Sequence, residues 1–197
     1  MPKKIDHEAR KQEILQAALK VFAREGYRNS NLSLIAAECS LSRPTIYQYF
    51  TDKEEIYHYA VKLVTGRMFS KYVSYVWRDP SGEVDKLIRI CEDIIDTADA
   101  NNIEISNLVG VMIQVKHEGR DFEGMIMHRT AKLSILFKRL IRSGMANGVV
   151  KSCDVDKVAE QLMVLLEGAC LRIAFFKKYD TTQDKDIIRT FLISFKK

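Results

Sequence analysis

The chain has 197 residues, of which 47% are hydrophobic and 29% are charged, and its formal net charge is +5. This length and composition suit one or two small domains with a buried core, and the 9 glycines and 3 prolines exclude collagen-like and low-complexity chains. No apolar run is long enough to span a bilayer, and the charged N-terminal segment lacks the apolar stretch of a secretory signal. We therefore expect a soluble, cytoplasmic chain with no membrane partner.

Apolar residues recur with a helical period almost throughout the chain, and no segment shows the period of two that is typical of strands. In chain order, the helices are predicted at about residues 7–25, 31–39, 43–50, 53–77, 83–99, 103–117, 122–147, 154–178 and 184–195. Gly26 is predicted to end the first helix, while Ser30 and Ser42 are N-cap candidates for the second and third. The sequence therefore predicts an all-α fold of about nine helices.

The four cysteines and four histidines are scattered along the chain. No C-x-x-C pair and no H-E-x-x-H motif occurs, so we expect reduced thiols, no metal site and no cofactor. The G-x-S-x-G motif, the Walker phosphate loop and the dinucleotide-binding fingerprint are also missing from the sequence. The motifs therefore do not favour an enzyme.

Two short helices joined by a tight turn, directly after a longer helix, are the layout of a helix-turn-helix. The small residues Ala36 and Cys39 allow the second and third helices to cross closely. Leu41 is predicted to fill the turn, and Ile46 is predicted to pack the third helix onto the first. This packing leaves the opposite face of the third helix exposed.

The exposed face carries residue types that bind nucleic acids. Arginine, here Arg43, is the commonest reader of guanine, and glutamine, here Gln48, can form two hydrogen bonds to adenine. The hydroxyls of Thr45 and Tyr49 can bind phosphate oxygens. Lys53 begins the next helix, where its ammonium group and the helix N-terminus can both meet a phosphate. Residues 1–53 also hold nine Lys and Arg against six Asp and Glu, which is consistent with an anionic partner.

Four patterns follow one another between residues 10 and 56. They are Ile14-Leu15-Gln16-Ala17-Ala18 with Phe22, then Gly26-Tyr27, then Ile35-Ala36, and finally Leu41-Ser42-Arg43-Pro44-Thr45-Ile46-Tyr47-Gln48-Tyr49-Phe50-Thr51-Asp52-Lys53-Glu54. Together they resemble the DNA-binding domain of the TetR family of bacterial regulators. One departure is Ser40, because the family usually has glycine in that turn, where left-handed dihedrals are common. A serine there costs about 1 kcal/mol.

The resemblance implies a role in DNA binding for nine residues. They are Ser33, near a phosphate; Ser42, Arg43, Pro44 and Thr45, at the start of the recognition helix in the major groove; Tyr47, Gln48 and Tyr49, on bases or backbone; and Lys53, on a phosphate. For Tyr47, packing in the core is an equal alternative. Arg43 and Gln48 have the alternative of being plain solvated helix positions.

The resemblance also implies two domains, a helix-turn-helix domain over residues 8–68 and a helical effector-binding and dimerisation domain over residues 69–197. The segment Val158–Ala169 is apolar over much of its circumference, and with the last helix it is similar to the dimer-forming helix pair of the family. We therefore expect a homodimer through the last two helices, with packing inside one subunit as the alternative.

An effector pocket in the second domain is implied by the same resemblance. Methionine and aromatic side chains adapt to irregular apolar ligands. The residues predicted to line the pocket are Phe69, Trp77, Met112, Phe122 and Met125. Ordinary core packing is the alternative at each of them.

These expectations combine into one function. We predict a sequence-specific transcriptional regulator that binds a palindromic operator in double-stranded DNA as a dimer. It is expected to act as a repressor and to respond to a small apolar effector. The alternatives are an activator of the same family, or an all-α protein-interaction domain that does not bind DNA.

Overall fold

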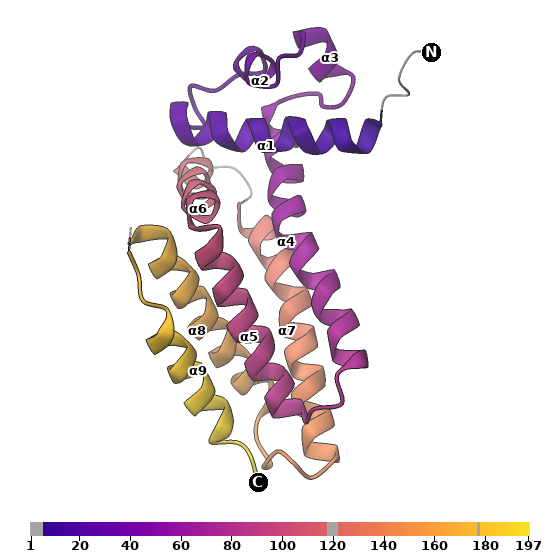
Figure 1. The fold of residues 1–197 in the computed structure, drawn as a ribbon, viewed down its shortest axis with the longest axis vertical. Helices are drawn as coiled ribbons and strands as arrows, with labels where there is room; N and C mark the ends of the chain where they lie inside the picture. The colour runs from indigo at the N-terminus through magenta and orange to yellow at the C-terminus, as the bar shows by residue number, and fades with distance from the viewer. Residues whose placement is uncertain (1–5, 118–121, 177) are drawn as a thin grey trace. The chain divides into compact units, whose positions relative to one another are not determined.

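The computed structural model describes residues 6–117, 122–176 and 178–197, and these residues form nine α-helices (Figure 1). The helices are α1 (His7–Glu25), α2 (Leu32–Glu38), α3 (Arg43–Tyr47), α4 (Lys53–Arg78), α5 (Glu83–Ala100), α6 (Asn102–His117), α7 (Phe122–Ala146), α8 (Val155–Phe175) and α9 (Thr182–Ile193). One isolated antiparallel bridge joins Val150 to Lys196. The predicted all-α fold is confirmed.

The N-cap of α2 differs from the prediction. The side-chain oxygen of Asn31 accepts hydrogen bonds of 3.0 Å from the amides of both Ser33 and Leu34. Ser30 is instead buried, and its hydroxyl donates a 2.6 Å hydrogen bond to the carbonyl of Gly26. The prediction of Ser30 as the N-cap is therefore wrong. Serine and asparagine are about equally good N-caps, so residue type alone could not choose between these neighbours.

The chain divides into two compact units. The first unit contains the residues up to Thr65 together with Asn107–Phe122, and the second contains Gly66–Ser106 and Glu123–Lys197. Helix α4 runs from Lys53 to Arg78, so it contributes residues to both units.

The core of the first unit is built from one face of α1 together with buried residues of α2, α3 and the start of α4. On α1 the buried positions recur every three or four residues, which is the spacing of a single helix face. Phe50 is only 1% exposed and Ile46 is fully buried, as expected for residues that fix α3. The buried side chains include Ile14, Ala18, Val21, Phe22, Ile35, Ala36, Ile46, Phe50 and Ile56.

Three aromatic rings close this core beside the start of α4. The ring centroids of Phe22 and Tyr27 are 5.2 Å apart, and those of Tyr27 and Tyr57 are 5.6 Å apart. Such tilted and edge-on arrangements are favourable because the positive edge of one ring meets the negative face of another. The cluster packs the end of α1 and the loop after it against α4.

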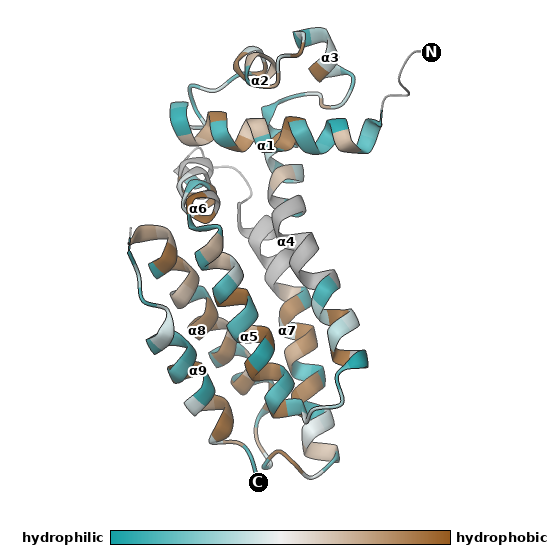
Figure 2. Cartoon of the chain, viewed as in Figure 1, coloured by the Kyte–Doolittle hydropathy of each residue, from teal (hydrophilic) through white to brown (hydrophobic). Residues whose placement is uncertain are grey.

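The second unit has its own apolar core. Helix α5 is apolar along one side, and brown residues also follow α8 in Figure 2. The buried core includes Leu87, Ile90, Ile94 and Ile95 of α5, Phe137, Leu140 and Ile141 of α7, Val158, Leu162 and Leu166 of α8, and Ile188 and Leu192 of α9. An ion pair of 2.9 Å between the half-exposed Arg172 and the buried Asp184 links α8 to α9.

Within the described ranges, no helix is long and apolar enough to cross a membrane. The same part of the chain holds no group of three or more His, Cys, Asp or Glu side chains that fits a metal ion. All four cysteines are free thiols. Burial raises the pKa of Cys39 to about 11, so this thiol stays protonated and unreactive near neutral pH.

Candidate DNA-binding surface

A tight turn separates α2 from α3 (Figure 1). Ser40 in this turn has a φ of 55°, which is the left-handed conformation that favours glycine. The amide of Ser40 donates to the carbonyl of Ala37 at 3.1 Å, and the amide of Leu41 donates to that of Ala36 at 2.8 Å. These bonds use carbonyls at the end of α2. The turn therefore ends α2 and sets the direction in which α3 begins. The left-handed turn that the family resemblance implies is therefore present, with serine in place of glycine.

Helix α3 begins at the cap that the sequence predicted. The hydroxyl oxygen of Ser42 accepts a hydrogen bond of 3.3 Å from the amide of Thr45, and the two hydroxyls are 2.7 Å apart. Pro44 lies in the first turn, where its missing amide proton costs nothing. The helix ends at Tyr47 rather than at Phe50, because Gln48 forms its C-cap.

The outer face of α3 carries polar side chains, one proline and one aromatic ring. Its exposed residues are Arg43, Pro44, Tyr47 and Gln48, whereas Thr45 and Tyr49 are half-buried. Tyr47 is 48% exposed, so its side chain belongs to the surface and not to the core. Of the two alternatives for this residue, only a surface role remains compatible with the structure.

Arg43 and Tyr47 form a pair on this face. The guanidinium Nη2 of Arg43 donates a 3.1 Å hydrogen bond to the Tyr47 hydroxyl, and the guanidinium carbon lies 5.5 Å from the ring centroid. The two residues are four positions apart, which places them on neighbouring turns of one helix face. The pair restrains the arginine along α3, and its remaining N–H donors are available for an acceptor outside the protein.

Tyr49 contacts a residue far from it in the sequence. Its hydroxyl lies 3.0 Å from Nδ1 of His7, and the two ring centroids are 5.8 Å apart. His7 is the first residue of α1, so this contact ties the start of α1 to the end of the helix-turn-helix. Ser33, on α2, is exposed. No local pattern could have revealed His7, because 42 residues separate it from its partner.

Lys53 lies at the first position of α4, but its ammonium group points inward. The nitrogen donates hydrogen bonds to the carbonyls of Tyr27, Arg28 and Ser30 at 2.8, 3.1 and 3.2 Å. It also lies 4.5 Å from the ring centroid of Tyr27. Lys53 thus fastens α4 to the loop between α1 and α2. Its predicted contact with phosphate stays a prediction.

Of the five residues predicted to line an effector pocket, the structure describes the side chain of one. Met112 is half-buried on α6. The side chains of Phe69, Trp77, Phe122 and Met125 lie outside the part of the chain that the structure describes.

An apolar stripe follows the outer side of α8 and continues to α9. On α8, Val164, Leu171 and Phe175 are 59%, 46% and 64% exposed, and on α9 Ile187 is 41% exposed. Gly168 lies among them, and a Cβ atom added there would meet nothing within 4 Å. We call these five residues the α8–α9 stripe.

The comparison with protein families locates the same region. Residues 14–60 match the family model described as bacterial regulatory proteins, tetR family. This range covers most of α1, the whole helix-turn-helix and the start of α4.

Similar proteins cover most of the chain. The transcriptional regulator PksA of Bacillus subtilis is 25% identical over 87% of this chain and 82% of its own length. The negative transcriptional regulator IcaR of the biofilm operon in Staphylococcus epidermidis is 21% identical over 88% and 89%. The crystal structure of FadR from Bacillus subtilis in complex with stearoyl-CoA covers 93% of this chain and 97% of its own, with a TM-score of 0.78 and 18% identity. At that identity the likeness concerns the fold.

Proposed function

Because this chain is a DNA-binding transcriptional regulator with a TetR-family helix-turn-helix domain, we propose that it is a repressor that binds a palindromic operator as a homodimer. The observation that carries the proposal is the outer face of α3, where Arg43, Tyr47 and Gln48 are exposed while Ile46 and Phe50 anchor the helix from behind. A rigid helix with a polar, arginine-bearing face suits the major groove of DNA, which admits one α-helix.

We assign different roles to the residues around this face. Arg43 and Gln48 are the proposed readers of base edges, because both can form two hydrogen bonds to one purine. The exposed Ser33, the hydroxyls of Ser42 and Thr45, and Tyr49 are the proposed phosphate ligands, with Lys53 as a further one. Pro44 and Tyr47 supply contact area on the same surface.

A dimer is proposed for two independent reasons. One short recognition helix contacts too few base pairs to locate a site in a genome, whereas two copies related by a two-fold axis read a palindrome. Their half-sites are then about 34–36 Å apart, or a multiple of that distance. In addition, the α8–α9 stripe exposes apolar side chains, which an isologous interface between two subunits would bury.

The response to a small molecule is proposed for the second unit, in keeping with a functional division into residues 8–68 and 69–197. Helix α4 contributes residues to both units, so a ligand that favours one position of this helix can change DNA affinity. The FadR neighbour is bound to stearoyl-CoA, which supports an effector with a large apolar part. The usual coupling of about 1–3 kcal/mol corresponds to a several-fold to hundred-fold change in affinity.

Repression is favoured over activation because IcaR is a negative regulator. The test starts from random duplexes, from which the purified chain selects its preferred sequence. Binding is then measured by fluorescence anisotropy at several salt concentrations, and in vitro transcription from a promoter that carries the selected site gives the direction of regulation. A palindromic consensus and lowered transcription are expected. Equal affinity for all duplexes would refute an operator, and raised transcription would indicate an activator.

A further inference from the structure

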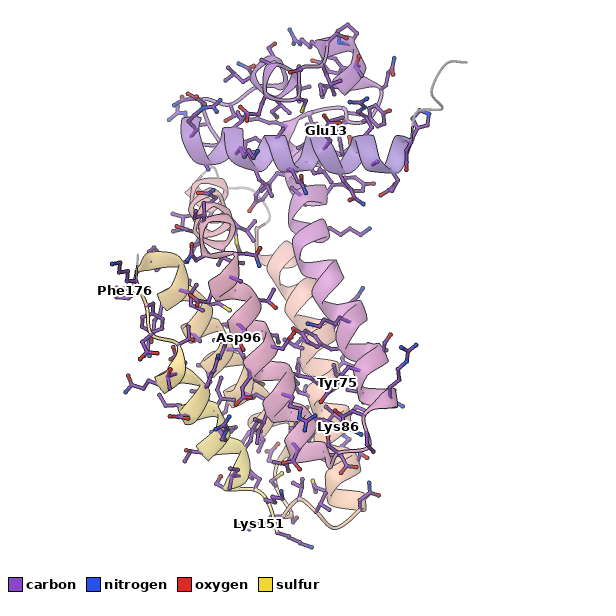
Figure 3. All side chains as sticks on the ribbon, in the orientation of Figure 1. Glu13, Tyr75, Lys86, Asp96, Lys151 and Phe176 are labelled. Atoms are coloured by element: carbon purple, nitrogen blue, oxygen red, sulfur yellow. The ribbon has the colours of Figure 1, made fainter. Side chains whose placement is uncertain are left out.

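A cleft lies between the C-terminal half of α4 and the middle of α5, within the second unit. Its volume is about 500 Å³, which is in the range of small-molecule sites. Tyr72 and Ile90 form part of its lining, and both are almost fully buried. Tyr75 lies between α4 and α5 in Figure 3, and it also lines a second hollow beside the α4–α5 loop. The two hollows share Tyr75, Arg78 and Arg89.

The charges along this cleft do not cancel. Lys71 and Asp93 neutralise each other, because the ammonium nitrogen is 2.6 and 2.7 Å from the two carboxylate oxygens. Arg89 donates a 3.2 Å hydrogen bond to Asp79, and this uses one of its five N–H donors. Arg78 is exposed at the rim and makes no ion pair that the described part of the chain shows. One positive charge is therefore left over, beside a second guanidinium with free donors.

The hydroxyl of Tyr75 gives a second, independent observation. Its oxygen is buried and makes no hydrogen bond of good geometry to any described residue; Asp79 and Arg89 lie near enough to interact with it only weakly. Burial raises the pKa of this phenol, so it remains a neutral O–H donor at neutral pH. A buried polar group without a partner costs free energy, and such groups are rare in folded proteins. A ligand atom in the cleft would supply the missing acceptor.

We propose that this cleft binds an organic anion, namely a carboxylate or a phosphate monoester attached to a flat apolar group. Arg78 and Arg89 hold the anion, since guanidinium groups match the two oxygens of a carboxylate or phosphate. The Tyr75 hydroxyl donates to the same ligand. The apolar group packs against Tyr72 and Ile90, which close the inner side of the cleft. This inference concerns binding alone and does not rest on the proposed operator or dimer.

The experiment is isothermal titration of the full chain with four probes. Phenyl phosphate and benzoate carry both features of the proposed ligand, benzyl alcohol lacks the charge, and inorganic phosphate lacks the apolar group. We expect saturable binding of at least one of the two aromatic anions. Benzyl alcohol and inorganic phosphate should each bind about tenfold more weakly, because each loses one of the two sets of contacts. Equal binding of either comparator, or binding of neither aromatic anion, would overturn the proposal.

Variants locate the binding site. R78Q and R89Q should each lower the affinity for the aromatic anion about tenfold. R142Q removes the same charge from an exposed position on α7 and should leave this affinity unchanged. Y75F should bind the aromatic anion about threefold more weakly or worse, yet its melting temperature should change little, because the lost hydroxyl makes no hydrogen bond of good geometry inside the protein. Wild-type binding by both arginine variants, or an equal loss in R142Q, would show that the anion binds elsewhere.

Discussion

The ammonium nitrogen of Lys53 is 2.8 Å from the carbonyl oxygen of Tyr27 and 4.5 Å from the centroid of the same residue's ring. Its other bonds, to the carbonyls of Arg28 and Ser30, use the remaining protons of the ammonium group. A phosphate must therefore compete with carbonyls that Lys53 already binds. The residue has two candidate roles, as an anchor for α4 and as a phosphate ligand, and they predict different measurements.

Replacing Lys53 with methionine separates these roles. Loss of the bonds to the loop carbonyls should lower the free energy of unfolding by about 1–3 kcal/mol. If the ammonium also binds phosphate, the slope of log affinity against log salt should become shallower by about one. We expect both effects, measured by urea unfolding and by anisotropy on random duplexes. Lys62→Met, on an exposed position of the same helix, is the control. Lowered stability with an unchanged salt slope would leave Lys53 as an anchor only.

Arg43 should determine specificity more than affinity for DNA in general. Arg43→Ala should weaken binding to the selected operator by about 1–3 kcal/mol and relax the base preference at one position of the site. Tyr47→Phe keeps the ring but removes the hydroxyl that holds the guanidinium, so it should cause a smaller loss on the operator alone. Lys20→Ala removes the same charge from an exposed position of α1. If Arg43→Ala weakened operator and random duplexes equally, its role as a base reader would be wrong.

The helix-turn-helix could be predicted because its determinants are local. Helix periodicity, the Ser42 cap, the small Ala36 and the buried Ile46 all act over a few residues, and the structure bears each of them out. The exposure of Tyr47 could not be decided in advance, because a tyrosine at that spacing suits either a core or a surface.

Contacts between segments that are distant in the sequence could not be predicted from local sequence patterns. His7 and Tyr49 are 42 positions apart, and Lys53 binds carbonyls more than 20 positions earlier. Nothing in the local pattern distinguishes Tyr75 or Arg89 from other residues of an amphipathic helix, because the cleft exists only when α4 lies against α5. The roles of these residues could therefore be assigned only from the tertiary structure.

Ser40 should be a site where glycine stabilises the fold. Its φ of 55° strains a residue that carries a Cβ atom, so Ser40→Gly should raise the free energy of unfolding by about 0.5–1 kcal/mol. Gly148 offers the reverse test, since its φ is 75°. Gly148→Ser should lower the free energy of unfolding by a similar amount. Ser33→Gly, inside α2, controls for the added backbone freedom and should destabilise. Urea titration checks all three, and a destabilised Ser40→Gly would contradict the strain.

Asp93 should make the stability of the fold depend on pH in the acidic range. Burial alone would raise the pKa of this carboxyl group, but hydrogen bonds from Lys71 and Tyr72 outweigh burial and leave the pKa below its usual value. Its contribution is therefore complete above the unfolded pKa of about 3.9 and is lost as the pH falls through the lower folded value. Because the carboxylate is 37% exposed, we expect an effect below about 1 kcal/mol.

Thermal unfolding between pH 6 and pH 3, a range of about 3 units around the reference pKa, checks this contribution. Asp93→Asn should be less stable than wild type at pH 6 and should lose less stability on acidification, since the substituted amide does not titrate. Asp186→Asn, at an exposed position of α9, should follow the wild-type curve. Parallel curves for wild type and Asp93→Asn would contradict a depressed pKa at Asp93.

The α8–α9 stripe should form the dimer interface, and Gly168 allows a clean test of it. A side chain at this position meets nothing within 4 Å in its own subunit, so Gly168→Glu should leave the monomer folded. At a two-fold interface, however, the substitution would bury two unpaired carboxylates among Val164, Leu171 and their partner copies, at a cost of several kcal/mol. We therefore expect a monomer by light scattering at micromolar concentration and a large loss of operator affinity. Gly168→Ala improves helix propensity without adding charge and should remain dimeric. A Gly168→Glu protein that stays dimeric and binds the operator like wild type would place the interface on another surface.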